Sequence, residues 1–120
     1  MFDHVQLRVK DLNSSKRFYA AALAPLGFTV QYESGGYVGL GPKGAPALWL
    51  GEGESRGSVH IALAATDRDA VKAFYAAAIP AGGKDNGAPG LRPDYHANYY
   101  AAFVTDPDGN NVEAVCHKAQ

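Results

Sequence analysis

The stretch HVQLRVKDLNSSKRFYAAALAPLG, residues 4–27, aligns without a gap on the later stretch HIALAATDRDAVKAFYAAAIPAGG, residues 60–83. The offset is 56 residues, and ten of the 24 aligned pairs are identical. The identical pairs include histidine, aspartate, a Phe-Tyr dipeptide and glycine, so shared alanine richness does not explain them. A repeat of this kind indicates that one supersecondary unit is used twice.

Each copy is predicted to open with a strand and to continue as a helix. Apolar residues alternate over 5–9 and again over 59–63, which is the pattern of a half-buried strand. Asp11 or Asn13 in the first copy, and Asp67 in the second, are suitable helix caps. Apolar residues then recur at helical spacing until prolines and glycines end each helix.

Short β-prone runs divided by turn residues follow each predicted helix. The Gly/Pro-rich segment 82–93 is interpreted as a loop. The unit is therefore a strand, a helix and two or three further strands, used twice. The predicted later strands are 28–33, 37–40 and 47–50 in the first copy, and 99–104 and 111–116 in the second.

Length and composition favour one domain. The chain has 120 residues, 47% of them apolar, which is enough to bury a hydrophobic core without stabilisation by disulfide bonds. Eleven basic residues against twelve acidic ones give a net charge of −1, which argues against nucleic acid or anionic lipid as a partner. Without a signal-like start, a membrane-span-like run or a second cysteine beside Cys116, a cytoplasmic location is expected.

Two histidines and a glutamate are candidate metal ligands. His4 and His60 share a repeat position, and both fall on the strand face opposite the apolar residues. Glu113 in the last strand is also expected to point away from the helices. Two histidines with one carboxylate suit zinc, nickel, manganese or iron, and they leave coordination positions open for substrate. The alternative for each histidine alone is a surface or hydrogen-bonded role.

Three segments together resemble the vicinal oxygen chelate superfamily, which includes glyoxalase I, bleomycin-resistance proteins and extradiol dioxygenases. They are FDHVQLRVKDLNSSKRFYAAALAPLGF, GSVHIALAATDRDAVKAFYAAA and YYAAFVTDPDGNNVEAV. The last is the most specific, because DPDG forms a turn leading into the strand that bears Glu113. The resemblance covers essentially the whole chain.

The resemblance implies an α+β fold in which two tandem βαβββ modules form a curled, cup-like, eight-stranded mixed sheet with helices outside. One domain would span residues 1–120, with module 1 at about 1–53 and module 2 at about 54–120. The metal ligands it implies are His4, His60 and Glu113.

The fourth ligand of the family, Glu or Gln on the fourth strand, is missing here. Leu48 or Trp49 stands at the matching place, and Glu52 near the strand end is a weaker substitute. The loss weakens an isomerase reading, because that reaction needs a base to remove a proton.

Other polar and aromatic residues are candidates for the same site. His96, Tyr99 and Tyr100 are candidate acid/base or substrate-orienting groups, although adjacent tyrosines on a strand point to opposite faces. Arg92 could hold an anionic substrate, and Trp49 is a candidate pocket wall. Each has a packing or surface role as its alternative.

The resemblance leaves several functions open. A metal-dependent enzyme on a small oxygen-bearing substrate is ranked first, with lactoylglutathione lyase-type lyase or isomerase chemistry ahead of an extradiol-type dioxygenase and a fosfomycin-resistance-type thiol transferase. A metal-free small-molecule binding protein of the bleomycin-resistance type is the alternative. A homodimer is expected, and the site lies either within one chain or across two.

Overall fold

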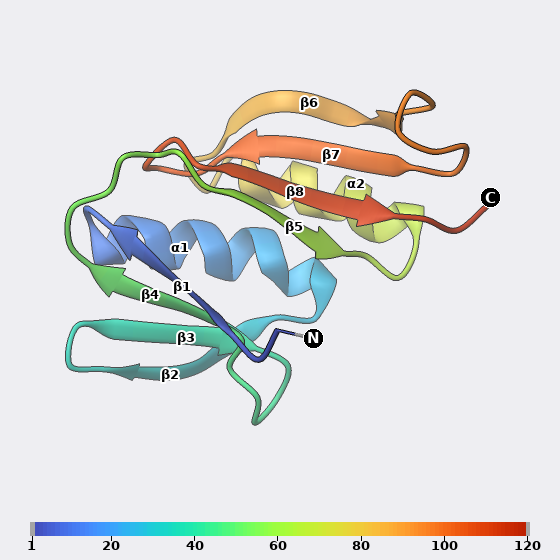
Figure 1. Cartoon of the computed structure of the whole chain (residues 1–120). Helices are drawn as coiled ribbons and strands as arrows, with labels where there is room; N and C mark the ends of the chain where they lie inside the picture. The colour runs from blue at the N-terminus through green and yellow to red at the C-terminus, as the bar shows by residue number, and fades with distance from the viewer. Residues whose placement is uncertain (1, 120) are drawn as a thin grey trace.

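The computed structural model describes residues 2–119. This part of the chain forms two β-sheets, each accompanied by one α-helix (Figure 1). In chain order the elements are β1 (Val5–Val9), α1 (Leu12–Leu23), the short 3₁₀ helix η1 (Ala24–Leu26), β2 (Thr29–Ser34), β3 (Tyr37–Gly41), β4 (Leu48–Glu52), β5 (His60–Ala64), α2 (Arg68–Ala78), β6 (Lys84–Leu91), β7 (Tyr100–Thr105) and β8 (Asn111–Cys116).

The two copies of the repeat fold with the same topology. The first four strands have the order β1-β4-β3-β2, and the last four have the order β5-β8-β7-β6. The first strand of each sheet is parallel to its neighbour, and the other pairs are antiparallel. This confirms the α+β fold of two tandem βαβββ units. The eight strands form two four-stranded sheets, and within residues 2–119 they do not close into a barrel.

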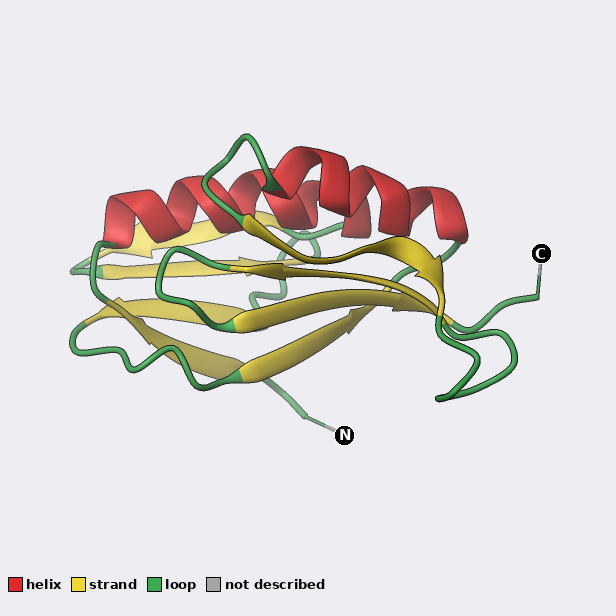
Figure 2. Ribbon diagram, turned by 90° about the horizontal axis from the view of Figure 1, so that it is seen from above, coloured by secondary structure: helices red, strands yellow, loops and turns green. Residues whose placement is uncertain are grey.

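Both helices cover the same side of the strands (Figure 2). Asp11 and Asp67 cap them, since their carboxylates accept hydrogen bonds from the backbone N–H groups of Ser14 and Ala70 at 3.1 and 2.7 Å. The core lies between helices and sheets, and its largest fully buried apolar side chains include Tyr19, Phe18, Phe74, Leu23, Leu40 and Leu50. Within the part of the chain that the structure describes, the opposite face of each sheet is not covered by a helix.

The prediction of a loop over 82–93 was wrong for most of that segment. Residues Lys84–Leu91 form β6, an edge strand paired with β7. Its register shifts between Asp85 and Gly87 and again between Gly87 and Gly90. An edge strand tolerates proline and glycine because one side of its backbone needs no partner, so turn-like composition concealed the strand.

Within residues 2–119, neither α1 nor α2 has the length and apolar character that crossing a membrane requires.

Candidate functional site

The open face of the second sheet, opposite α2, brings His60 and Glu113 together. Ala62 and Glu113 are register partners on adjacent strands, so His60, two residues before Ala62, lies on the same face as Glu113. The His60 Nε2 atom lies 2.8 Å from Glu113 Oε1. Glu113 is buried (1% exposed), whereas about half of the His60 side chain is exposed. A buried carboxylate with an accessible imidazole beside it forms a chemically unusual pair on a sheet surface.

Tyr99 completes this cluster. Its hydroxyl donates a hydrogen bond to Glu113 Oε2, so both oxygens of the carboxylate have partners. Burial, and then the hydrogen bond and charge of Glu113, raise the pKa of Tyr99 to about 12. Tyr99 is therefore protonated at neutral pH and acts as the donor in this contact.

The donor chemistry of His60 and Glu113 fits a divalent transition metal as part of its ligand set. Imidazole nitrogen and carboxylate oxygen bind such ions at about 2.0–2.2 Å, which puts neighbouring ligand atoms about 3.0–3.5 Å apart. The observed separation of 2.8 Å is that of a hydrogen bond, so the two atoms would move slightly apart to bind one ion. Two protein ligands are too few for a stable site, and residues 2–119 contain no group of three His, Cys, Asp or Glu side chains able to hold an ion.

His4, the third expected ligand, lies apart from this pair. It directly precedes β1, and its Nδ1 atom lies 2.6 Å from Asp3 Oδ1. Its side chain is about half exposed. A metal site made of His4, His60 and Glu113 stays a prediction. Within the described part of one chain, His4 does not join the other two residues in a group that could hold an ion.

The strand register shows which residue of the first sheet corresponds to Glu113 of the second, the position where the family has its fourth ligand. Gln6 pairs with Trp49 in the first sheet, and Ala62 pairs with Glu113 in the second. Gln6 and Ala62 occupy the same repeat position. Trp49, rather than Leu48, is therefore the first module's counterpart of Glu113.

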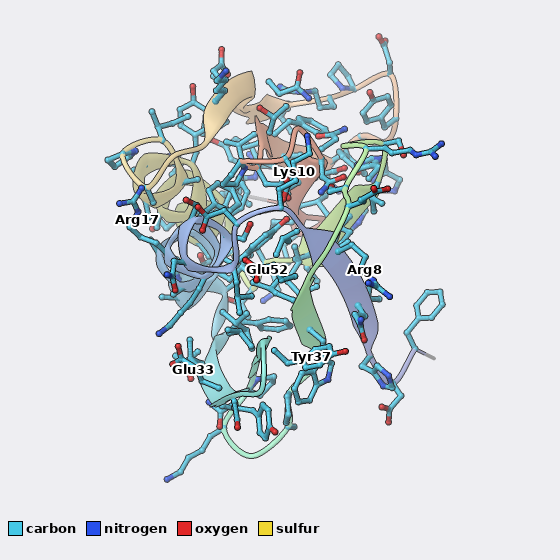
Figure 3. All side chains as sticks on the ribbon, turned by 90° about the vertical axis from the view of Figure 1, so that its left-hand side faces the viewer. Arg8, Lys10, Arg17, Glu33, Tyr37 and Glu52 are labelled. Carbon is cyan, nitrogen blue, oxygen red and sulfur yellow. The ribbon has the colours of Figure 1, made fainter. Side chains whose placement is uncertain are left out.

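Trp49 belongs to an aromatic cluster on the open face of the first sheet. A Cβ atom built on Gly39 would lie 2.9 Å from its ring, so the glycine provides a seat for the indole. The ring of Tyr32 lies edge-on to it at 5.3 Å. Trp49, Tyr32 and Tyr37 line a shallow hollow that also includes His4. Arg8 projects from this open side in Figure 3, whereas Arg17 lies on the helix side.

The other candidates lie in different places. Tyr100 is on the helix side, where the guanidinium of Arg68 lies 5.0 Å from its ring centre. His96 lies in the loop before β7, with its ring 5.9 Å from that of His117. Glu52 accepts a hydrogen bond of 3.4 Å from the backbone N–H of Leu12, at the start of α1. Of the two adjacent tyrosines, only Tyr99 faces Glu113.

Arg92 and Phe103 extend the cluster along the second sheet. Phe103 is the register partner of Glu113, and its ring centre lies 6.4 Å from that of His60. The Arg92 Cζ atom lies 5.4 Å from the same Phe103 ring centre. Phe103 was not among the residues predicted from the sequence, although its alternation with the buried residues 102 and 104 was a signal for the open face.

The model of the Glyoxalase/Bleomycin resistance protein/Dioxygenase superfamily matches residues 1–114. A glyoxalase/bleomycin resistance protein from Albidiferax ferrireducens T118 is 30% identical, with a TM-score of 0.82, over 98% of this chain and 99% of that one. A putative glyoxalase from Bacillus halodurans is 25% identical, with a TM-score of 0.72, over 97% and 95% of the two chains.

A glyoxalase I variant from Zea mays is 27% identical, with a TM-score of 0.72, over 95% of this chain and 45% of that one. No curated protein matches the chain.

Proposed function

The chain belongs to the Glyoxalase/Bleomycin resistance protein/Dioxygenase superfamily, and on this premise we propose that it is a divalent-metal-dependent enzyme acting on a small oxygen-bearing substrate. The observation that carries the proposal is the buried Glu113 carboxylate, held by His60 and Tyr99 on an open sheet face. Burial of a carboxylate is costly, so a structural role alone gives little reason to keep one there.

The proposed metal site is shared between two chains of a homodimer. His60 and Glu113 of one protomer would supply two ligands, and His4 of the partner subunit would supply the third. Two features support this arrangement: His4 lies away from the pair in its own chain, and its side chain is exposed beside the open face of the first sheet. Zinc, nickel, manganese and iron all suit this ligand set.

The roles of the protein groups follow from their contacts. A bound metal would supply Lewis-acid polarisation of substrate oxygens. Tyr99 would fix the orientation of the Glu113 carboxylate, because its protonated hydroxyl already donates to Oε2 and leaves Oε1 directed at His60. The exposed half of the His60 side chain marks the side from which substrate approaches.

Lyase or isomerase chemistry of the lactoylglutathione lyase type is the first reaction class to test. Trp49 at the counterpart position of Glu113 supplies no carboxylate, and Glu52 is directed at the start of α1. Proton abstraction in such a reaction would need another base. Extradiol-type dioxygenase and fosfomycin-resistance-type thiol transferase activities are therefore tested alongside it.

A metal-free binding protein is the second candidate, and the aromatic cluster of Trp49, Tyr32 and Tyr37 favours it. Aromatic side chains on an open face bind flat apolar molecules without any need for a metal. In that case Glu113 and His60 would remain hydrogen-bonded to each other, and tight binding would occur without turnover.

Metal analysis of mixed dimers tests the proposal. The variants His4→Ala and His60→Ala, each alone, are expected to lose the metal that wild-type protein retains. A dimer of one chain of each kind, isolated through two different affinity tags, has one intact shared site and is expected to recover half of the wild-type metal. His96→Ala is the matched control, because His96 is an exposed histidine in the loop before β7, outside the proposed ligand set.

Three outcomes would reject parts of the proposal. No metal in wild-type protein after anaerobic reconstitution rejects the enzyme in favour of the binding protein. Full metal content in His4→Ala rejects the third ligand. A mixed dimer without metal rejects the site shared between chains.

A further inference from the structure

A polar hollow adjoins the His60–Glu113 pair on the same face of the second sheet. Its volume is about 320 Å³, and it is lined by Asn86, Gly87, Arg92, Tyr95, Phe103 and Asn111. Asn111 is the register partner of His60, and Phe103 is the register partner of Glu113. The hollow therefore lies directly beside His60 and Glu113 on the sheet.

Backbone contacts hold Arg92 in place at the entrance to the β6–β7 loop. Its N–H donates to the carbonyl oxygen of Tyr99 at 2.7 Å, and its own carbonyl accepts from the N–H groups of Tyr95 and His96. The same Tyr99 donates its hydroxyl to Glu113. Arg92 is thus fixed relative to the candidate metal pair, which is what a substrate-binding group requires.

The guanidinium of Arg92 packs against two glycines, Gly87 and Gly90, which have no side chains to occupy its place. A Cβ atom on Gly87 would lie 3.1 Å from Arg92 Nη2, and one on Gly90 would lie 3.1 Å from Nη1. Gly87 also has φ of +147°, a conformation that other residues rarely adopt. Phe103 supports the guanidinium from the sheet, at 5.4 Å between Cζ and the ring centre.

The donors of this hollow are mostly unused. Among the described residues, the guanidinium makes one hydrogen bond, from Nη2 to the carbonyl oxygen of Ala88 at 2.8 Å. Asn86 donates to Asn111 at 3.3 Å, which leaves amide hydrogens of both side chains available. Within residues 2–119, no Asp or Glu side chain lines the hollow, and the nearby Asp85 carboxylate accepts from the Gly87 N–H.

We propose that this hollow is a subsite for a carboxylate group of the substrate. The inference rests on the proposed function, since it assigns one end of the substrate to Arg92 and the oxygen-bearing end to His60 and Glu113. The planar fork of a guanidinium matches the two oxygens of a carboxylate, and the two asparagine amides supply further donors. The substrate class is therefore a small molecule with a metal-chelating oxygen pair at one end and a carboxylate at the other.

The test uses the metal-free, ¹⁵N-labelled chain of 120 residues, titrated with succinate and with neutral succinamide at matched ionic strength. Succinate is expected to shift the Arg92 Nε and the Asn86 and Asn111 side-chain amide signals saturably, and succinamide is not. Arg92→Gln is expected to weaken succinate binding about tenfold or more, because hydrogen bonds to a charged group are lost. Arg17→Ala, an exposed arginine on α1, serves as the control and should bind as wild type does.

Several results would overturn the subsite: equal shifts with succinamide, shifts confined to other residues, or unchanged binding in Arg92→Gln. Stronger binding of inorganic phosphate at the same signals would overturn its assignment to carboxylates. Because no metal is present, the result is independent of the mixed-dimer experiment. Succinate binding without any metal site would reject the proposed enzyme alone, and a metal site without succinate binding would reject the subsite alone.

Discussion

Replacing Asp106 with alanine is expected to lower the free energy of unfolding by about 3–5 kcal/mol. Asp106 is buried at the start of the DPDGN turn that leads into β8 and Glu113. Its Oδ2 atom accepts from the Tyr19 hydroxyl at 2.5 Å and from Asn110 Nδ2 at 2.9 Å. Its Oδ1 atom accepts from the backbone N–H groups of Asp108 and Asn110 at 2.9 and 2.8 Å.

The magnitude follows from the groups left without an acceptor. Tyr19 and Asn110 are buried, at 0% and 2% exposure, so water cannot replace the lost carboxylate without rearrangement. Each buried donor left unsatisfied costs about 1–3 kcal/mol. Three such donors, one from Tyr19 and two from Asn110, give the expected range after partial relaxation of the exposed turn. That loss is a large part of the roughly 5–15 kcal/mol that stabilises a typical domain.

Urea unfolding followed by fluorescence of Trp49, the single tryptophan, measures the effect. All variants are compared at one protein concentration, because a homodimer would make stability depend on it. Asp94→Ala in the exposed β6–β7 loop is the control, with an expected change within about 0.5 kcal/mol. A double-mutant cycle with Tyr19→Phe should show coupling between the two side chains. A loss below about 1 kcal/mol for Asp106→Ala, or strict additivity in the cycle, would refute this account of the turn.

Three further changes test the fold. Burial, and then the charge of Asp106, raise the pKa of Tyr19 far above its ordinary value of 10. The folded state thus holds the Tyr19 proton more tightly than the unfolded state, so this contribution is intact below pH 10 and is lost as the pH rises further. Urea midpoints measured across that range should fall more steeply in wild type than in Tyr19→Phe. Gly41→Ala should destabilise by several kcal/mol or prevent folding, since its Cβ would lie 2.2 Å from the backbone oxygen of Ala45; a wild-type melting temperature would contradict this. Phe74→Ala, at a fully buried ring, should cost about 3–5 kcal/mol in urea unfolding, and a cost near zero would mean that the core had been misplaced.

Much of the fold could be predicted because its signals are local. Alternation over 5–9 and 59–63 predicted strands. Asp11 or Asn13, and Asp67, were the predicted caps, and the helices begin after Asp11 and Asp67, since caps depend on neighbouring backbone N–H groups. The strand β6 was missed because an edge strand is held by its partner β7, and its own glycines and proline resemble those of a loop. Its existence depends on distant residues that local composition does not describe.

Strand phase was also sufficient to predict the open-face pair within one sheet. His60 and Glu113 lie on strands that are direct neighbours, so one face of one sheet brings them together. Phase gives no information on how two sheets are placed relative to each other. The predicted convergence of His4 with His60 depends on that placement, so it stays a prediction that spacing within the chain could not establish.

The two copies of the repeat carry different side chains at the positions proposed to bind a metal. Equivalent positions in the two copies carry His4 with Trp49 and His60 with Glu113. In the first copy a tryptophan over Gly39 replaces the carboxylate, and in the second the position that matches Gly39 by register is Phe103. The large aromatic side chain is thus on β4 in the first copy and on β7 in the second, and only the second copy has a carboxylate at this pair of positions. The first module therefore presents an aromatic surface where the second presents a carboxylate, so the two open faces differ in what they can bind although their backbones repeat.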